Sequence, residues 1–227
     1  MNRRIANRPT QRHMHGMHRR HLLSLSLGPL LVASLPVLAQ PRFQPTQQDR
    51  GDIARIEAYL DTLRTLKARF LQVAPNGAIS QGTAWLERPG RMRFQYDPPS
   101  PLLLVAGHGL VVFHDNQLNQ TSNIPLSQTP LGILLAENVK LSGDVTVTGM
   151  QRLPGQIQVS VVRTASPGDG TLTLIFADNP LVLRQWTVLD AQHQETRVTL
   201  YNVETGSSFD PKLFEFIDPR FFQPGSR

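Results

Sequence analysis

The chain has 227 residues, 23 basic and 17 acidic side chains, and no cysteine. The lack of cysteine excludes disulfide bonds, thiol catalysis, thiolate metal sites and lipid attachment to a mature N-terminal cysteine. Six of the arginines lie in the first 39 residues, so the other 188 residues carry 17 charges of each sign. Nucleic-acid binding requires a lasting basic surface, and the charge balance therefore predicts no nucleic-acid partner.

Residues 1–39 have the pattern of a cleavable signal peptide. Basic residues without any acidic one precede an apolar run from Leu22 to Leu38, and Val37-Leu38-Ala39 predicts cleavage after Ala39. The run is short for a membrane span, which needs about 20 apolar residues, although a permanent N-terminal anchor is the alternative. Arg19-Arg20 also resembles a twin-arginine signal. We expect export to the periplasm by the Sec or the twin-arginine route.

The first element of the mature chain is predicted to be a helix. Residues 40–51 are polar and are expected to form a flexible lead-in to one domain, residues 52–227. Ile53, Ile56, Leu60 and Leu63 recur at spacings of three and four, which predicts an amphipathic helix with Asp52 as a possible N-cap. This helix either packs on an ordinary core or lies over a cavity.

The rest of the chain is dominated by period-two patterns that are separated by glycine, proline, asparagine and aspartate turns. These patterns do not alternate with helices, so the predicted class is mainly antiparallel β, as a sandwich or barrel. So many hairpins in series favour an open β-barrel or strongly curved sheet that can enclose ligand space. The predicted strands are 67–73, 79–87, 91–96, 102–106, 110–114, 145–150, 157–163, 171–177, 181–189 and 195–203.

A short apolar helix is predicted in the middle of the chain. Thr129 can cap it and Pro130 suits its first position. Leu131 and Ile133 to Leu135 make it apolar almost all round. Such a helix must be buried, pressed on a membrane or laid over an apolar cavity.

Few residues indicate chemistry. The histidines of the mature chain, His108, His114 and His193, are predicted to be solvated residues at turns and a strand end. A metal site that combines a histidine with Asp115 or Asp190 is the alternative. We find no Gly-x-Ser-x-Gly nucleophile motif. We therefore predict no catalytic residue, no metal and no cofactor, and a protein that is not an enzyme.

Three segments, one of them the predicted hairpin from Val105 to Phe113, resemble the periplasmic outer-membrane lipoprotein carriers of the LolA family. The stretch Gln81-Gly82-Thr83-Ala84-Trp85-Leu86-Glu87-Arg88-Pro89-Gly90-Arg91-Met92-Arg93-Phe94 is similar to that family's pattern G-x-x-W-x-x-R-P, followed by apolar and aromatic positions. Thr129 to Leu135 resembles its lid segment. The resemblance extends from Ile53 to about Phe216. Phe94 stands where many members have tryptophan, and Met92 where many have phenylalanine.

The resemblance implies an incomplete β-barrel with an apolar interior covered by helices. It implies acylated lipoproteins as cargo, an inner-membrane ABC transporter of the LolCDE type as donor, and an optional outer-membrane receptor of the LolB type. A monomer is expected. The family's functional arginine, which donates hydrogen bonds to lid carbonyls, matches Arg88, although an exposed arginine before a turn is the alternative. The residues predicted to line the cavity and lid, some of which could be ordinary core, are Ile56, Leu60, Trp85, Met92, Phe94, Leu131, Ile133, Leu134 and Leu135.

The sequence thus predicts a periplasmic carrier that binds lipoprotein acyl chains and delivers them to the outer membrane. Two alternatives stay open. One is a binding module of the same fold for another lipid or hydrophobic ligand. The other is a secreted hydrolase.

Overall fold

A computed structural model describes residues 43–217, so the predicted signal peptide and the last ten residues lie outside the described part of the chain. Strands predominate over helices in this range, as expected. The helices are α1 (Gln47–Thr62) and α2 (Leu131–Leu134), with 3-10 turns η1 (Leu126–Gln128), η2 (Pro167–Asp169) and η3 (Pro211–Phe214). The strands are β1 (Thr65–Val73), β2 (Ile79–Glu87), β3 (Arg91–Tyr96), β4 (Leu102–Gly107), β5 (Leu110–Asp115), β6 (Gln120–Pro125), β7 (Val145–Leu153), β8 (Gln156–Arg163), β9 (Gly170–Ala177), β10 (Val182–Asp190) and β11 (Glu195–Thr205).

All eleven strands of the described range form one antiparallel sheet, which confirms the predicted class. Their order is β6-β5-β4-β3-β2-β1-β11-β10-β9-β8-β7, so chain neighbours pair everywhere except at the centre, where β1 pairs with β11. The ten predicted strands are present. The eleventh, β6, was not predicted, because Gln120–Pro125 is polar, lacks alternation and is largely exposed at one edge of the sheet.

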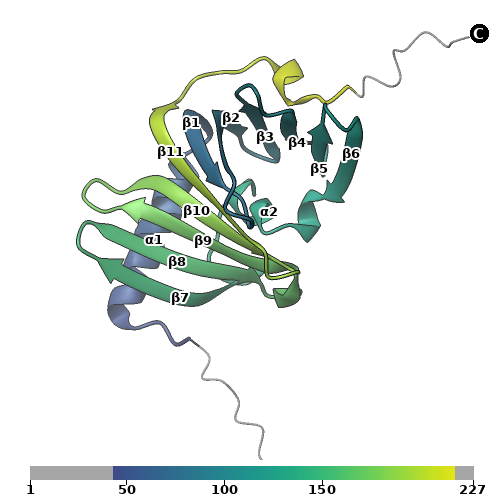
Figure 1. Cartoon of the computed structure of the whole chain (residues 1–227). Helices are drawn as coiled ribbons and strands as arrows, with labels where there is room; N and C mark the ends of the chain where they lie inside the picture. The colour runs from purple at the N-terminus through teal and green to yellow at the C-terminus, as the bar shows by residue number, and fades with distance from the viewer. Residues whose placement is uncertain (1–42, 218–227) are drawn as a thin grey trace, which may run out of the picture. The chain divides into compact units, whose positions relative to one another are not determined.

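The sheet curls strongly without closing. The Phe94 ring on β3 lies 6.0 Å from the Trp186 ring on β10, although β2, β1 and β11 separate these two strands in the sheet. Breaks in strand register, such as the one between Leu183 and Gln185, accompany the curvature. The edge strands β6 and β7 remain unpaired with each other, so the barrel is incomplete (Figure 1).

Helix α1 covers the inner face of the β7 to β10 part of the sheet (Figure 1). It begins at Gln47 rather than near Asp52, and its N-cap is Thr46, which forms a reciprocal capping box with Asp49. The predicted Asp52 cap is therefore wrong. That carboxylate instead accepts a 2.7 Å hydrogen bond from Nε of Arg152 on β7, which also binds Asp49.

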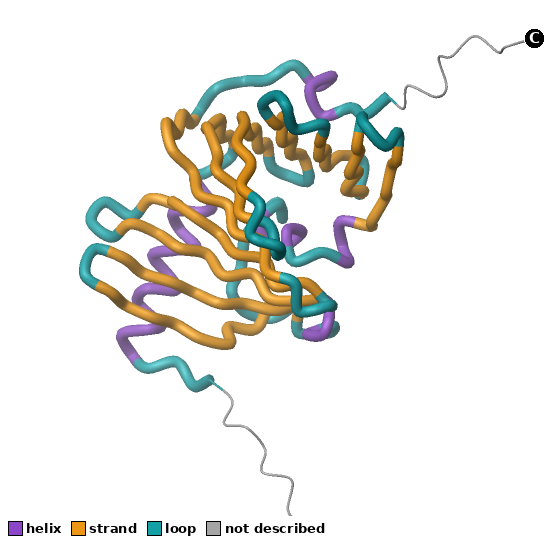
Figure 2. Tube along the Cα trace, viewed as in Figure 1, coloured by secondary structure: helices purple, strands orange, loops and turns teal. Residues whose placement is uncertain are grey.

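Residues 126–144, here called the crossing segment, connect β6 to β7 and so run from one edge of the sheet to the other across its open side (Figure 2). Helix α2 lies within it. The predicted Thr129 cap is wrong: the Thr129 hydroxyl donates 3.0 Å to the Leu126 carbonyl, and Pro130 occupies the N-cap position. Over residues 43–217, no helix is long and apolar enough to cross a membrane.

The residues after β11 pack on the outer face of β3 to β5. Phe214 is buried there, and Arg93 on β3 donates a 3.2 Å hydrogen bond from Nη1 to the Leu213 carbonyl. The approach is so close that a Cβ on Gly107 would lie 2.7 Å from the Phe214 carbonyl oxygen. The ring of Phe216 lies 5.1 Å from that of His114. The C-terminal segment thus leaves the inner face of these strands to the crossing segment.

Candidate functional site: the apolar interior and its crossing segment

The inner face of the curled sheet, α1 and the crossing segment form one apolar cluster. On β3 the inward positions alternate, and Phe94 pairs across the sheet with Ala84 on β2 and Leu104 on β4, which places all three on the same face. Most of the predicted cavity and lid residues meet here, each at most 3% exposed: Ile56, Leu60, Met92, Phe94, Ile133, Leu134 and Leu135. Leu131 is partly buried against the same cluster.

Trp85 is the exception and corrects the prediction. The buried positions of β2 are Gly82, Ala84 and Leu86, so the two-residue period turns Trp85 to the opposite, outer face. There it pairs in register with Lys67 on β1 and Arg93 on β3. The family motif that contains Trp85 does not determine on which face of the sheet its side chain lies.

Four buried aromatic residues of the interior were missed: Phe70, Tyr96, Phe176 and Trp186. Phe70 on β1 lies 4.5 Å from Phe94, ring centroid to centroid, and Phe176 on β9 lies 5.9 Å from Tyr59 of α1. Phe70 and Phe176 follow the two-residue alternation of apolar positions that is visible in the sequences of β1 and β9. This alternation could therefore have identified both as interior residues. Trp186 could not be found this way, because the register shift in β10 interrupts the alternation.

Part of the inner face remains open beside the crossing segment. Phe113 on β5 pairs with Leu104 and therefore points inward, yet it is 36% exposed. Ile124 on β6 pairs with the inward Val111 and is 46% exposed. Apolar surface thus continues from the packed interior to solvent along β4 to β6.

Arg88 is buried at the boundary of this cluster, only 6% exposed, which excludes the solvated-turn interpretation. It continues the inward alternation of β2 by one position after Leu86. Its Nε donates 2.8 Å to the Leu63 carbonyl at the end of α1, and its Nη1 donates 3.3 Å to the Ala136 carbonyl in the crossing segment. Burial lowers the pKa of the guanidinium from its usual value.

Arg88 therefore reaches the carbonyl of Ala136, directly after the segment that resembles the lid, and the carbonyl of Leu63, the residue that caps the end of α1. Around it, the Gly90 amide donates 2.9 Å to the Leu135 carbonyl, and Arg64 Nη1 donates 2.7 Å to the Glu137 carbonyl. These contacts fix residues 135–137 of the crossing segment through their backbone carbonyls, so they require no particular side chain at those three positions.

The described residues include three histidines, His108, His114 and His193. His108 and His193 lie at turns with positive φ, as predicted, but His114 is only 2% exposed, which corrects its assignment as solvated. Its ring nitrogens contact Thr121 Oγ1 at 3.0 Å and Asn116 Oδ1 at 3.1 Å, so neither is directed at a carboxylate. Within residues 43–217 no group of three or more potential metal ligands is found.

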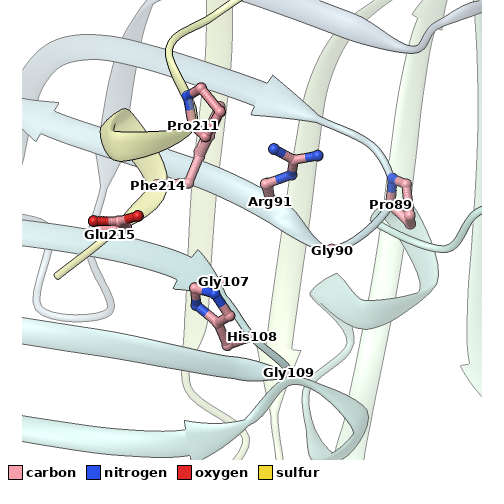
Figure 3. Close-up of a pocket in the computed structure, with 9 residues that line it drawn as sticks. All are labelled: Pro89, Gly90, Arg91, Gly107, His108, Gly109, Pro211, Phe214 and Glu215. Carbon is pink, nitrogen blue, oxygen red and sulfur yellow. The ribbon is translucent and has the colours of Figure 1, made fainter.

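A separate cleft of about 360 Å³ lies on the outer face, where the turns before β3 and before β5 meet the C-terminal segment (Figure 3). The Arg91 guanidinium lies 5.9 Å from the centre of the Phe214 ring and 2.9 Å from the Glu87 carboxylate. Pro89 and Gly90 separate this cleft from Arg88. The cleft was not predicted, because the C-terminal segment that forms one of its walls has no periodic pattern.

Comparisons with known proteins identify relatives of this chain. The family described as outer membrane lipoprotein carrier protein LolA matches residues 61–217. An outer-membrane lipoprotein carrier protein of Methylococcus capsulatus is 31% identical over 183 residues, which cover 77% of this chain and 87% of that protein. The protein of the same name from Azotobacter vinelandii is 28% identical over 186 residues, with coverages of 77% and 88%. A solved LolA superfamily protein of Nitrosomonas europaea aligns with 72% of this chain and 97% of its own at a TM-score of 0.41 and 8% identity. The chain is a member of the LolA family.

Proposed function

We propose that the mature protein is a periplasmic carrier, not an enzyme, that shields the acyl chains of lipoproteins in its apolar interior. The observation that carries this proposal is the crossing segment. It closes the open side of the sheet with apolar side chains, yet much of its second half is held through backbone carbonyls that accept from Arg88, Arg64 and Gly90. Such a cover can be released without unfolding the sheet.

Loading requires the cover to move, because the inner side chains already pack against one another. Each methylene that an acyl chain buries contributes about 0.8 kcal/mol, so binding gains strength with chain length. The half-exposed Phe113 and Ile124 offer apolar surface for first contact. The interior then opens further as Ile133, Leu134 and Leu135 are displaced from it.

Release of the cargo requires an interaction that favours the empty, closed form of the carrier, and Arg88 provides this interaction. Its hydrogen bond to the Ala136 carbonyl forms when the crossing segment is seated on an empty interior, while the bond to Leu63 holds the guanidinium in place. Because the bond to Ala136 stabilises only that state, it favours the empty form over the loaded one. A carrier built this way accepts cargo from an active donor and returns to its closed form at the destination.

In the proposed pathway, an inner-membrane ABC transporter of the LolCDE type hands the acylated lipoprotein to this protein in the periplasm. Delivery to the outer membrane follows, directly or through a receptor of the LolB type. The predicted signal peptide and the carrier names of the relatives support this location and this cargo.

The test is a two-step transfer. Inner-membrane vesicles that contain the host's transporter and a labelled lipoprotein receive ATP and the purified protein. We expect soluble lipoprotein that outer-membrane vesicles then take up, and none from a lipoprotein whose acylated cysteine is replaced by serine. Vesicles that hydrolyse ATP but keep all their lipoprotein would contradict the proposal.

A further inference from the structure

A second arginine occupies a position equivalent to that of Arg88 in the opposite part of the sheet. The inward residues of β8 are Ile157, Val159 and Val161, all buried, and Arg163 follows them at the end of the strand. Arg88 follows the inward residues of β2 in the same manner. Each guanidinium therefore ends an apolar inner stripe and points toward the interior rather than the outer surface.

Arg163 contacts the first half of the crossing segment. Its Nη2 donates a 3.3 Å hydrogen bond to the Thr129 carbonyl, which also accepts from the Gly132 amide at 3.1 Å. A Cβ on Gly132 would lie 2.3 Å from that same Nη2 and 2.5 Å from the Leu126 carbonyl oxygen, so a side chain at residue 132 would collide with both the guanidinium and the preceding turn. Pro130 packs nearby, with its Cγ 3.1 Å from the position that a Cβ on Gly170 would take.

The crossing segment is thus held at two points by opposite parts of the sheet, and at a third point by α1, where the Leu141 amide donates a 2.7 Å hydrogen bond to Glu57 Oε1. Its first half is fixed to β8 and the start of β9, and its second half to the end of β2 through Arg88. Neither guanidinium is fully paired: Arg163 Nε and Arg88 Nη2 are buried and find no hydrogen-bond partner among the described residues. A buried unpaired donor destabilises the closed form, so each contact is strong enough to hold the segment and weak enough to open.

We propose that Arg163 is a second positioning residue for the crossing segment, and that Gly132 is the glycine that admits it. The proposal rests on the proposed carrier function, because it assigns Arg163 to the same closed, empty state that Arg88 stabilises. Both contacts must break before the segment can leave the interior. Loss of either one therefore favours the loaded form and slows release of cargo.

Amide hydrogen exchange on the cargo-free protein tests the contact itself. In Arg163→Leu, the amides of Gly132 and Ile133 should exchange faster while those of β8 and β9 keep wild-type protection. Gly132→Ala should produce the same local effect with Arg163 still present. The matched control is Arg197→Leu, an arginine whose side chain is 50% exposed on β11. Unchanged exchange at residues 132 and 133 in Arg163→Leu would overturn the proposal, whatever the result for Gly132→Ala and whether or not the protein carries lipoproteins.

Cargo release tests the role. Loaded Arg163→Leu should release acylated lipoprotein about tenfold more slowly than wild type, because one charge-assisted hydrogen bond to the closed form is lost. Arg163→Lys should restore part of the rate, and the slowing in the Arg88→Leu/Arg163→Leu double variant should be the product of the two single effects. Release at the wild-type rate from a variant with raised exchange would also overturn the proposal. A wild-type protein that takes up no acylated lipoprotein would instead contradict the carrier function, before any variant is compared.

Discussion

At the scale of single residues, the site depends on two charged side chains in an otherwise apolar interior. A buried guanidinium must find hydrogen-bond acceptors, and the carbonyls near the end of a short helix and of α1 are acceptors that need no polar side chain. Arg88 uses the Ala136 and Leu63 carbonyls in this way. Lysine, with a compact charge instead of a planar fork, cannot reach both with the same geometry.

Replacement of Arg88 should slow the release of cargo without preventing its binding. We expect Arg88→Leu to fold and to accept cargo but to release it about tenfold or more slowly, since each ~1.4 kcal/mol removed from the empty form changes the balance tenfold. Arg88→Lys should be intermediate. The measurement is the rate of transfer of labelled lipoprotein from purified carrier to outer-membrane vesicles. An unchanged rate in Arg88→Leu would show that the buried contacts of Arg88 serve the fold alone.

Phe94 and Trp85 form a matched pair for the interior, because they lie on neighbouring strands and on opposite faces. Phe94→Ala should lower the free energy of unfolding by about 3–5 kcal/mol, since it removes a ring that packs on Phe70 and Trp186. Trp85→Ala should have a clearly smaller effect, because that side chain is only partly buried. Urea denaturation monitored by circular dichroism measures both, and equal losses would argue against the assigned faces.

At the scale of elements, α1 and the crossing segment cover the same interior but are held differently. The first turn of α1 is fixed by Arg152, which contacts Asp49 and Asp52 at 2.7 Å each. In its last turn, the Tyr59 hydroxyl accepts a 3.1 Å hydrogen bond from the Leu183 amide. The ion pairs of the crossing segment lie beyond α2 and are longer, with Lys140 Nζ 3.8 Å from the Glu57 carboxylate and 3.7 Å from the Asp61 carboxylate of α1. We therefore infer that α1 stays on the sheet while the crossing segment moves.

The attachment of α1 should weaken at low pH. Hydrogen bonds from the Thr46 amide and hydroxyl and from Arg152 lower the pKa of Asp49 from 3.8 to about 2. The carboxylate therefore adds stability that is complete above about pH 4 and is lost as the pH falls toward 2. The free energy of unfolding of Asp49→Asn should depend less on pH between 4 and 2 than that of wild type.

Urea denaturation at pH 4, 3 and 2 makes this comparison. Asp144→Asn, at an exposed position before β7, is the control and should follow the wild-type curve. Identical pH dependence in wild type and Asp49→Asn would contradict the assigned role of the capping box and of Arg152.

The elements that the sequence predicted well are those with a strong period. The alternation of apolar and polar residues located ten strands. The sequence of β6 does not alternate, because an exposed edge strand has no buried face that requires apolar residues. The start of α1 was misplaced because Thr46 and Asp49 cap it from within a polar stretch that otherwise looks like a linker. Helix α2 was expected from its apolar composition, but its length of four residues follows from where the carbonyls of residues 135–137 are bound.

At the scale of the whole molecule, antiparallel topology and the incomplete barrel could be predicted, but the contacts across the opening could not. Arg88 came from a motif, and its partners Leu63 and Ala136 lie 25 and 48 residues away. Arg163 does not belong to any recognised motif, and only the two-residue alternation along β8 indicates that its side chain lies on the inner face of the sheet. Such pairings depend on how strongly the sheet curls, which no local pattern encodes.

The central claim is that this curled sheet carries an acylated protein behind a movable segment. Native mass spectrometry of the protein isolated from periplasm without detergent tests it most directly. The account predicts a one-to-one complex with an acylated lipoprotein, which is lost when the acylated cysteine of that cargo is replaced by serine. A protein that is always isolated empty, or that holds only free lipid, would contradict the account.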